Sequence, residues 1–223
     1  MNATAIRVLL GVALAALPLH GEEIFDGKSL KGWSGDPRLW RVEDGAIVGK
    51  TDTNGHKIDA NTFLIWQGGE PGDFELTFKA RVAGNNSGVQ YRSKVKDAAK
   101  WSVTGYQMDL HPKQVYLGML YEEGGRGISC LRGQKVDLAK GAKPVITGKL
   151  DVGEVDLAKW NEYRLVAKGN KLQHYVNGKL AAEIVDLDPE KGASSGTLAL
   201  QLHRGPAMRA EFKEIQLKRL DQK

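Results

Sequence analysis

The sequence predicts an all-β protein, a jelly-roll β-sandwich of two antiparallel sheets with few short helices. Apolar and polar residues alternate along most of the chain after Gly21, which is the period of a half-buried strand. Turns rich in glycine and asparagine separate these short runs at close intervals. Many short strands joined by regular turns typically fold as a sandwich or jelly roll.

The strands follow from this alternation in chain order. Segment 73–82 shows it best, because Phe74, Leu76 and Phe78 share one face while charged residues and threonine occupy the other. Further strands are expected at 46–50, 62–66, 88–92, 104–110, 115–121, 127–131, 162–168, 171–176, 181–185, 197–203 and 209–218. Segments 95–101 and 136–140 are the two that could form short helices.

Two local features refine the strands. Asn177-Gly178 lies between two strand-like runs and predicts a hairpin, because a type I′ turn needs positive φ at both central residues. In the last strand the alternation slips between Phe212 and Ile215, which predicts a β-bulge.

Composition limits the class of protein. A chain of 223 residues, 41% of them hydrophobic, can bury a core without cross-links, and the single cysteine, Cys130, excludes an internal disulfide framework. The formal net charge of +5 is not concentrated in any run of five basic residues, so a nucleic-acid partner is not expected. Cys130 is expected to be a small buried residue.

The first residues differ from the rest. In segment 1–21 Arg7 is the only charged side chain, and an apolar run at 8–17 follows it. This run has the length of a signal-peptide core and is too short to span a bilayer; a buried N-terminal helix would need a polar face. We expect 1–21 to be a cleaved signal and 22–223 a single domain, exported to the periplasm or cell exterior, without a transmembrane segment or lipid anchor.

Three strands carry unusual polar faces. Each begins with a small residue and continues with amide, guanidinium, carboxylate or imidazole groups instead of lysine and glutamate. The faces are Gly88, Gln90 and Arg92; Gly105, Gln107 and Asp109; and Ala199, Gln201 and His203. Such planar groups suit recognition of sugar hydroxyls, and small residues would leave room for a ligand. The alternative is a polar network that supports a sheet edge.

Neighbouring segments add candidates. Segment 117–127 leads from a strand end into a glycine-rich turn and contains Tyr121, Glu123 and Arg126. Side chains at such a turn often face a cleft, although Glu123 and Arg126 could instead pair at the surface. Trp101 lies in a polar loop and is a candidate for stacking on a sugar ring. The histidines His56, His111 and His174 have no companions at ligand spacing and are expected to be structural.

Several motifs resemble one known family. They include Phe25-Asp26-Gly27-Lys28-Ser29-Leu30-Lys31-Gly32-Trp33, Ser87-Gly88-Val89-Gln90-Tyr91-Arg92, Gly105-Tyr106-Gln107-Met108-Asp109, Tyr121-Glu122-Glu123-Gly124-Gly125-Arg126-Gly127 and Leu200-Gln201-Leu202-His203. In their order and spacing the chain resembles the 3-keto-disaccharide hydrolase domain family. The resemblance implies a concanavalin A-like jelly roll, export, and hydrolysis of 3-keto-glycosides or 3-keto-disaccharides, with elimination as the route. The residues in matching motifs are Arg92, Gln107, Asp109, Glu123, Arg126, Gln201 and His203.

A chemical scheme fits these residues. A ketone at C3 acidifies the C2 proton, so a glycoside can lose its aglycone by elimination, after which water adds. His203 is expected to act as base or acid, with Asp109 as its partner or the alternative base. Either Arg92 or Arg126 would stabilise the enolate. The expected substrate-binding side chains are those of Gln107, Gln201, Gln90, Glu123, Tyr121 and Trp101.

The same residues are compatible with other classes of function. A divalent cation that polarises the keto oxygen is compatible with the scheme, but no ligand spacing identifies one. A conventional glycosidase of this fold places Glu-x-Asp-x-x-Glu on one strand, whereas Gln107 and Pro112 stand at the carboxylate positions here. The competing class is a non-catalytic carbohydrate-binding module. In either case the expected partner is a small carbohydrate.

Overall fold

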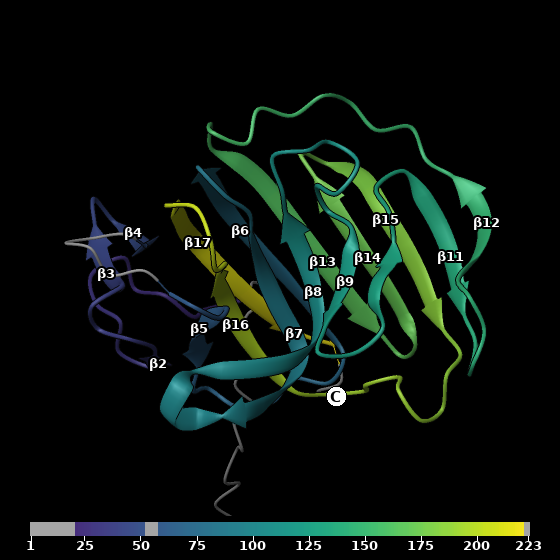
Figure 1. Cartoon of the computed structure of the whole chain (residues 1–223), viewed down its shortest axis with the longest axis horizontal. Coiled ribbons are helices and arrows are strands. Elements are labelled where there is room, and N and C mark those ends of the chain that lie inside the picture. The colour runs from purple at the N-terminus through teal and green to yellow at the C-terminus, as the bar shows by residue number, and fades with distance from the viewer. Residues whose placement is uncertain (1–20, 52–57, 221–223) are drawn as a thin grey trace, which may run out of the picture.

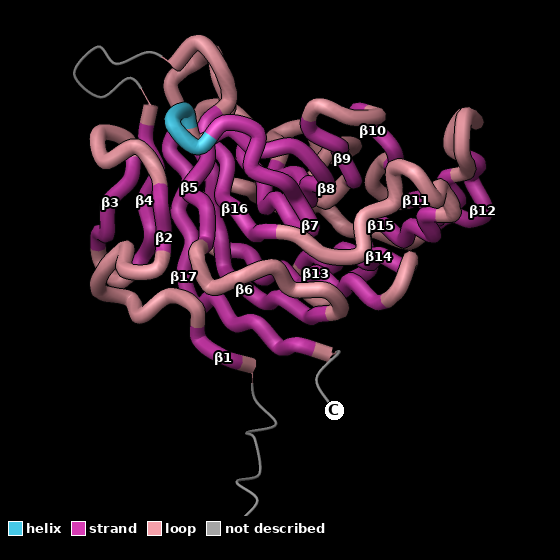
Figure 2. The backbone as a smooth tube through the Cα atoms, turned by 90° about the horizontal axis from the view of Figure 1, so that it is seen from below, coloured by secondary structure: helices cyan, strands magenta, loops and turns pink. Residues whose placement is uncertain are grey.

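Two β-sheets lie face to face in the computed structural model, which describes residues 21–51 and 58–220 (Figure 1). The predicted signal segment, apart from Gly21, lies outside the described residues, as does His56. The view in Figure 2 shows the strands of the two layers one above the other.

Each sheet is built from strands that are distant in the sequence. In spatial order, the ten-stranded sheet contains β12 (Val145–Lys149), β11 (Gln134–Leu138), β15 (Lys179–Asp186), β14 (Lys171–Val176), β13 (Asn161–Lys168), β6 (Phe74–Ala83), β17 (Arg209–Arg219), β4 (Ala46–Lys50) and β3 (Trp40–Glu43), with β1 (Glu22–Glu23) paired to β17. The seven-stranded sheet contains β10 (Gly127–Cys130), β9 (Leu120–Glu123), β8 (Ser102–Leu110), β7 (Ser87–Asp97), β16 (Thr197–Leu202), β5 (Thr62–Trp66) and β2 (Trp33–Ser34). The predicted all-β sandwich is confirmed.

The core lies between the sheets and follows the predicted alternation. In β6 every second residue from Phe74 to Val82 is buried, and the residues between them are partly exposed. Phe78 stacks on Tyr163 of the adjacent strand β13, with ring centroids 5.1 Å apart. Cys130 is buried, as predicted.

Both local refinements are confirmed. Asn177 and Gly178 have φ of 49° and 78° in the turn between β14 and β15, as a type I′ hairpin requires. The register of β17 against β6 shifts between Lys213 and Gln216, and Glu214 there has a φ of 52°, which is the predicted bulge.

Neither of the two segments that were expected to form short helices is helical over its whole length. Segment 136–140 belongs largely to β11, in which Val136 and Leu138 are buried against β15. Strand β7 extends to Asp97, so only a single 3₁₀ turn, Ala98–Lys100, remains of 95–101. The pairing of β11 with β15 is parallel, the one such pair among the described strands.

One strand prediction is wrong in position. Most of the segment predicted as a strand at 115–121 is a series of turns, and β9 begins only at Leu120. These turns are held against β8 by backbone hydrogen bonds between Asp109 and Gly118 and between Asp109 and Met119. The segment therefore forms a loop over the end of β8 and not part of the sheet.

In the described ranges there is no helix long and apolar enough to cross a membrane.

Candidate active site

A cavity of about 300 Å³ lies over the seven-stranded sheet, on the face opposite the core. Its lining residues come from strands β8, β9, β10 and β16 and from adjoining loops. Figure 1 shows where these strands lie in the sheet. The lining residues are Asn61, Asn86, Gln107, Asp109, His111, Tyr116, Met119, Tyr121, Glu123, Ile128, Gln201 and His203.

Strand alternation and register bring the polar side chains to this face. In β8, Tyr106 and Met108 point into the core, so Gln107 and Asp109 point the opposite way. Gln107 is opposite Gln90 on β7 and opposite Tyr121 on β9. The predicted grouping of Gln107, Asp109, Gln201 and His203 in one place is therefore found, together with Tyr121 and Glu123.

A chain of hydrogen bonds fixes the floor of the cavity. The Nε2 of Gln107 donates to Asp109 Oδ1 at 2.7 Å and lies 3.3 Å from Gln201 Oε1. Glu123 Oε2 accepts from Gln201 Nε2 at 3.3 Å and from Asn61 Nδ2 at 3.1 Å. Because these groups are held by one another, their remaining polar atoms are preorganised for a ligand.

Gln90 lies behind this floor. Its side chain is fully buried, donates to Gln107 Oε1 at 2.9 Å, and accepts from the Ser93 hydroxyl at 2.6 Å. Gln90 is not among the residues that line the cavity. It therefore positions Gln107, and its predicted role in binding is not supported by its position.

Asp109 is the carboxyl group with the most unusual environment in the cavity. Its side chain is buried, and this burial raises its pKa to about 7; the Gln107 hydrogen bond lowers the pKa and the charge of Glu123 raises it. A carboxyl group with such a pKa exchanges protons near neutral pH, as a catalytic acid or base must.

Asp109 should make the protein less stable as pH rises. In the folded state it keeps its proton up to about pH 7, whereas in the unfolded chain it loses it near pH 4. Between these values the folded state binds the additional proton, so the free energy of unfolding falls with rising pH. Between pH 5 and pH 8 we expect the free energy of unfolding of Asp109→Asn to rise by about 3 kcal/mol relative to that of the wild type. Urea unfolding of both proteins at each pH measures this difference. A constant difference between the two proteins would contradict this.

His203 follows β16 and has a defined tautomer. Asn85 Oδ1 accepts from the Asn86 N–H at 2.8 Å, so the Asn85 amide nitrogen faces the Arg204 carbonyl at 3.1 Å. His203 Nδ1 lies 2.6 Å from the same carbonyl oxygen, which can only accept a hydrogen bond. The Asn85 amide nitrogen also lies 3.3 Å from Nδ1, but the contact with the carbonyl oxygen is much shorter and requires a proton between the two atoms. With the proton on Nδ1, the Nε2 of the neutral ring carries the lone pair.

Four polar residues of the cavity were not predicted. Asn61 and Asn86 come from loops, and Asn86 Oδ1 is buried without a hydrogen-bond partner in the described structure. Such an acceptor is usually satisfied by water or a ligand. His111 continues the alternation of Gln107 and Asp109, so its position could have been predicted. Tyr116 lies in the loop that was expected to be a strand.

Arg92 does not share the face of Gly88 and Gln90, and that prediction is wrong. The register of β7 shifts between Tyr91 and Lys94, and Arg92 has a φ of 45°, so its side chain leaves the alternation. The side chain is 1% exposed, and its guanidinium donates to three carbonyl groups and to Asp73. The carbonyl groups belong to Gly72, Gly169 and Ala193. Arg92 is therefore a structural residue that joins loops.

Arg126 is also engaged away from the cavity. It forms ion pairs with Glu122 and with Asp186, whose Oδ2 lies 2.6 Å from Arg126 Nη2. Its guanidinium also lies over the Tyr106 ring, 6.0 Å from the centroid. Arg126 is not a lining residue of the cavity, and the surface pair of Arg126 with Glu123 is not formed. The expectation that it stabilises an enolate in this cavity is not supported by its position.

Trp101 packs beside the site and not in it. Its ring lies against Phe63, Ile65, Val103 and Ala199, and its Nε1 donates to Ser34 Oγ at 3.2 Å. It does not line the cavity. The predicted stacking of Trp101 on a sugar in this cavity is therefore not supported by its position.

The small residues on the polar faces serve packing. A Cβ atom on Gly88 would lie 2.5 Å from Gln107 Cδ, so glycine lets the Gln107 side chain lie across β7. Gly105 has a φ of 138°, and a Cβ there would meet Ser93 at 2.7 Å. The space expected for a ligand at Gly88 is thus occupied by the side chain of Gln107.

No cation site can be assigned. Within residues 21–51 and 58–220 there is no group of three or more histidine, cysteine, aspartate or glutamate side chains placed to hold a metal ion.

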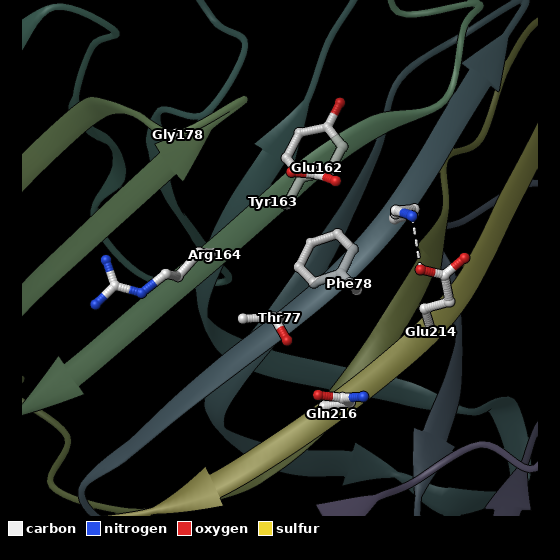
Figure 3. Close-up of a pocket in the computed structure, with 9 residues that line it drawn as sticks. Thr77, Phe78, Glu162, Tyr163, Arg164, Gly178, Glu214 and Gln216 are labelled. Atoms are coloured by element: carbon white, nitrogen blue, oxygen red, sulfur yellow. Dashed lines mark ion pairs between the residues drawn. The ribbon is translucent and has the colours of Figure 1, made fainter. Parts of the chain in front are cut away.

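A second hollow, of about 350 Å³, lies on the other sheet (Figure 3). Two of its charged groups form an ion pair, with Lys79 Nζ 2.7 Å from Glu214 Oε2 (Figure 3). A third, Arg164, pairs with Glu75 outside the hollow. This arrangement is typical of a solvated strand face. We assign no ligand to this hollow.

Solved structures confirm the fold. The chain is similar to a suspected glycosyl hydrolase from Parabacteroides distasonis, with 20% identity, coverage of 89% of this chain and 93% of that one, and a TM-score of 0.58. It is also similar to the carbohydrate-binding module CBM66 from Bacillus subtilis, with 15% identity, coverage of 84% and 95%, and a TM-score of 0.55. A Bacillus subtilis protein of unknown function with a galectin-like fold gives 11% identity, coverage of 85% and 90%, and a TM-score of 0.55.

Among proteins with curated descriptions, none matches the chain. The match to a domain family is extensive: residues 21–218 match the 3-keto-alpha-glucoside-1,2-lyase-like domain. This match includes every residue that lines the cavity over β8, β9 and β16 and supports a carbohydrate-active function. The chain therefore belongs to the family of 3-keto-alpha-glucoside-1,2-lyase-like domains, as its motifs predict.

Proposed function

We propose that the cavity over β8, β9 and β16 cleaves glycosides that are oxidised at C3, by elimination across C1 and C2 followed by hydration. The observation that carries the proposal is that two groups able to transfer protons, Asp109 and His203, line one polar cavity. Asp109 has a pKa raised to about 7 by burial, and His203 presents a free Nε2. The description of the family supports this substrate class.

The reaction requires one proton to be removed and one to be supplied. His203 Nε2 takes the C2 proton, which the C3 ketone acidifies, and the electron pair forms the enolate. When the enolate collapses, the C1–O bond breaks and a C1=C2 double bond forms. Protonated Asp109 gives its proton to the departing oxygen, which is the role that a carboxyl group of raised pKa can fill near neutrality. Water then adds to the enone.

The remaining polar groups bind the sugar. Gln107 and Gln201 contact each other, and hydrogen bonds to Asp109 and Glu123 hold them in place. Because their side chains are already ordered, their amide groups can bind sugar hydroxyls with little further loss of side-chain entropy. The buried Asn86 Oδ1 supplies an acceptor without a partner in the described structure. Tyr121 adds an aromatic wall.

The competing function is carbohydrate binding without turnover. The similarity of the fold to the module CBM66 favours it. Such a module binds through aromatic platforms and hydrogen bonds and has no need of a carboxyl group with a pKa near 7. We therefore prefer the enzyme.

We also propose that the chain is exported, because segment 1–21 has the pattern of a signal peptide. Expression with and without this segment, followed by N-terminal sequencing of the protein outside the cytoplasm, tests it. Recovery of uncleaved protein in the cytoplasm alone would contradict export.

The substrate class is tested with matched pairs of sugars. Purified protein is incubated with 3-keto-trehalose, 3-keto-sucrose and their unoxidised parents, and the released sugars are measured. We expect release only from the 3-keto compounds, because only the ketone acidifies C2. Turnover of the parents would indicate a conventional glycosidase, and binding of any of these sugars without turnover would favour the binding module.

A further inference from the structure

The enolate in this reaction needs a hydrogen-bond donor, and neither arginine supplies it. Arg92 is held by three carbonyl groups and Asp73, and Arg126 by Glu122 and Asp186. Negative charge that develops on the C3 oxygen must therefore be met by a donor in the cavity wall. The amide donors of Gln107, Gln201 and Asn61 are already directed at Asp109, Gln201 and Glu123, whereas the His111 imidazole lines the cavity with its donor fixed by its own surroundings.

The His111 ring is oriented by two contacts. The backbone N–H of Lys113 donates to His111 Nδ1 at 2.9 Å, so Nδ1 is an acceptor. The Tyr116 ring meets the imidazole edge to face, with centroids 5.0 Å apart and an angle of 74° between the rings. Because a neutral imidazole carries one proton, that proton is on Nε2, and Nε2–H is the polar group left for the cavity.

The same contacts keep the imidazole neutral. If His111 Nδ1 carried a proton, it and the Lys113 N–H would be two hydrogen-bond donors pointing at each other, which is unfavourable. Burial, and then the charges of Lys113 and His203, lower the pKa of His111 below its usual value. A neutral imidazole donates a hydrogen bond to an enolate without surrendering its proton, and this use of a neutral histidine is known from enzymes that enolise ketones.

The two histidines of the cavity thus present opposite groups. His203 offers the lone pair of Nε2, because its Nδ1 donates to the Arg204 carbonyl. His111 offers an N–H, because its Nδ1 accepts from Lys113. Both tautomers are set by backbone partners on the loops that follow β8 and β16, so the backbone conformation fixes which ring accepts and which donates.

We propose that His111 Nε2–H holds the C3 oxygen of the substrate and stabilises the enolate while His203 removes the C2 proton. This inference rests on the proposed function. The C2–H electron pair moves into the C2–C3 bond and the carbonyl electrons move onto the oxygen. When the carbonyl reforms, the C1=C2 bond forms and the C1–O bond breaks. His111 keeps its proton throughout, and the departing oxygen takes its proton from Asp109.

Enolisation can be measured apart from cleavage with a 3-keto C-glycoside, whose carbon-linked aglycone cannot leave. Exchange of its C2 proton in D₂O is followed by NMR. In His111→Asn the shorter amide can still accept the Lys113 N–H, as in an Asx turn, but it withdraws the donor from the Nε2 position. We expect its exchange rate to fall about 10²–10³-fold, the effect of removing one donor to an oxyanion.

A second variant and a spectroscopic measurement separate this role from a structural one. His111→Gln places an amide N–H near the former Nε2 position, and we expect it to restore exchange to within about tenfold of the wild type. The infrared C=O stretch of the bound C-glycoside should lie at a lower wavenumber in the wild type and His111→Gln than in His111→Asn. Gln216→Ala, in the hollow on the other sheet, is the control and should leave both readings unchanged.

The outcomes distinguish the two proposals. If the wild type exchanges C2 but His111→Asn exchanges equally fast with the same C=O stretch, the role of His111 is wrong and the proposed function stands. If the wild type neither exchanges the C-glycoside nor cleaves 3-keto O-glycosides, the proposed function itself is wrong.

Discussion

His203→Ala should lower the release of aglycone from a 3-keto-glycoside by about 10²–10⁴-fold, the usual contribution of a positioned general base. The imidazole is partly exposed at the end of β16, so its removal leaves the sandwich core intact. The expected result is a loss of kcat with an unchanged free energy of unfolding. Initial rates and urea unfolding of the same preparation measure both.

The control for this substitution is Gln216→Ala, which lies on the opposite sheet and should turn over at the wild-type rate. Wild-type turnover by His203→Ala would assign the C2 proton to another group. Asp109 would then be the remaining candidate among the predicted bases, because it also lines the cavity.

Arg92→Met should destabilise the fold by about 3–5 kcal/mol, because it removes a buried guanidinium and leaves three carbonyl groups, as well as the partly exposed Asp73, without their donor. The affected loops contain Gly72, Gly169 and Ala193, far apart in the sequence. The midpoint of urea unfolding measures the change.

Arg164→Met is the matched control. Its guanidinium pairs with Glu75 on the exposed face of the other sheet, where an ion pair contributes about 0–1 kcal/mol. An Arg92→Met protein with wild-type stability and lost turnover would contradict the structural role and would return Arg92 to the catalytic scheme.

The alternation of polar and apolar residues was enough to predict most of the sandwich. Strand β6 illustrates why: its inner face packs on β13 and its outer face is solvated, so each position has one preferred residue type. Segment 136–140 was ambiguous because a run of five residues fits one helical turn as well as a strand. The neighbours β15 and β12 decide its conformation, and they come from elsewhere in the chain.

The site was predictable as far as alternation continues without interruption. Alternation places Gln107 and Asp109 on one face of the sheet. Continued by one more step of two residues, it would also have placed His111 there. It fails at Arg92, because a bulge with positive φ turns that side chain away, and a bulge inside a strand leaves little trace in the pattern. Asn61 and Asn86 join the cavity through tertiary contacts alone.

Solvent deuterium in the product tests elimination most directly. The wild type is allowed to cleave a 3-keto-disaccharide in D₂O, and the released 3-keto sugar is examined at C2 by NMR and mass spectrometry, beside the same sugar incubated without enzyme. Elimination and hydration predict one deuterium at C2 in each molecule released. Release of a sugar that retains its original C2 proton would contradict the account.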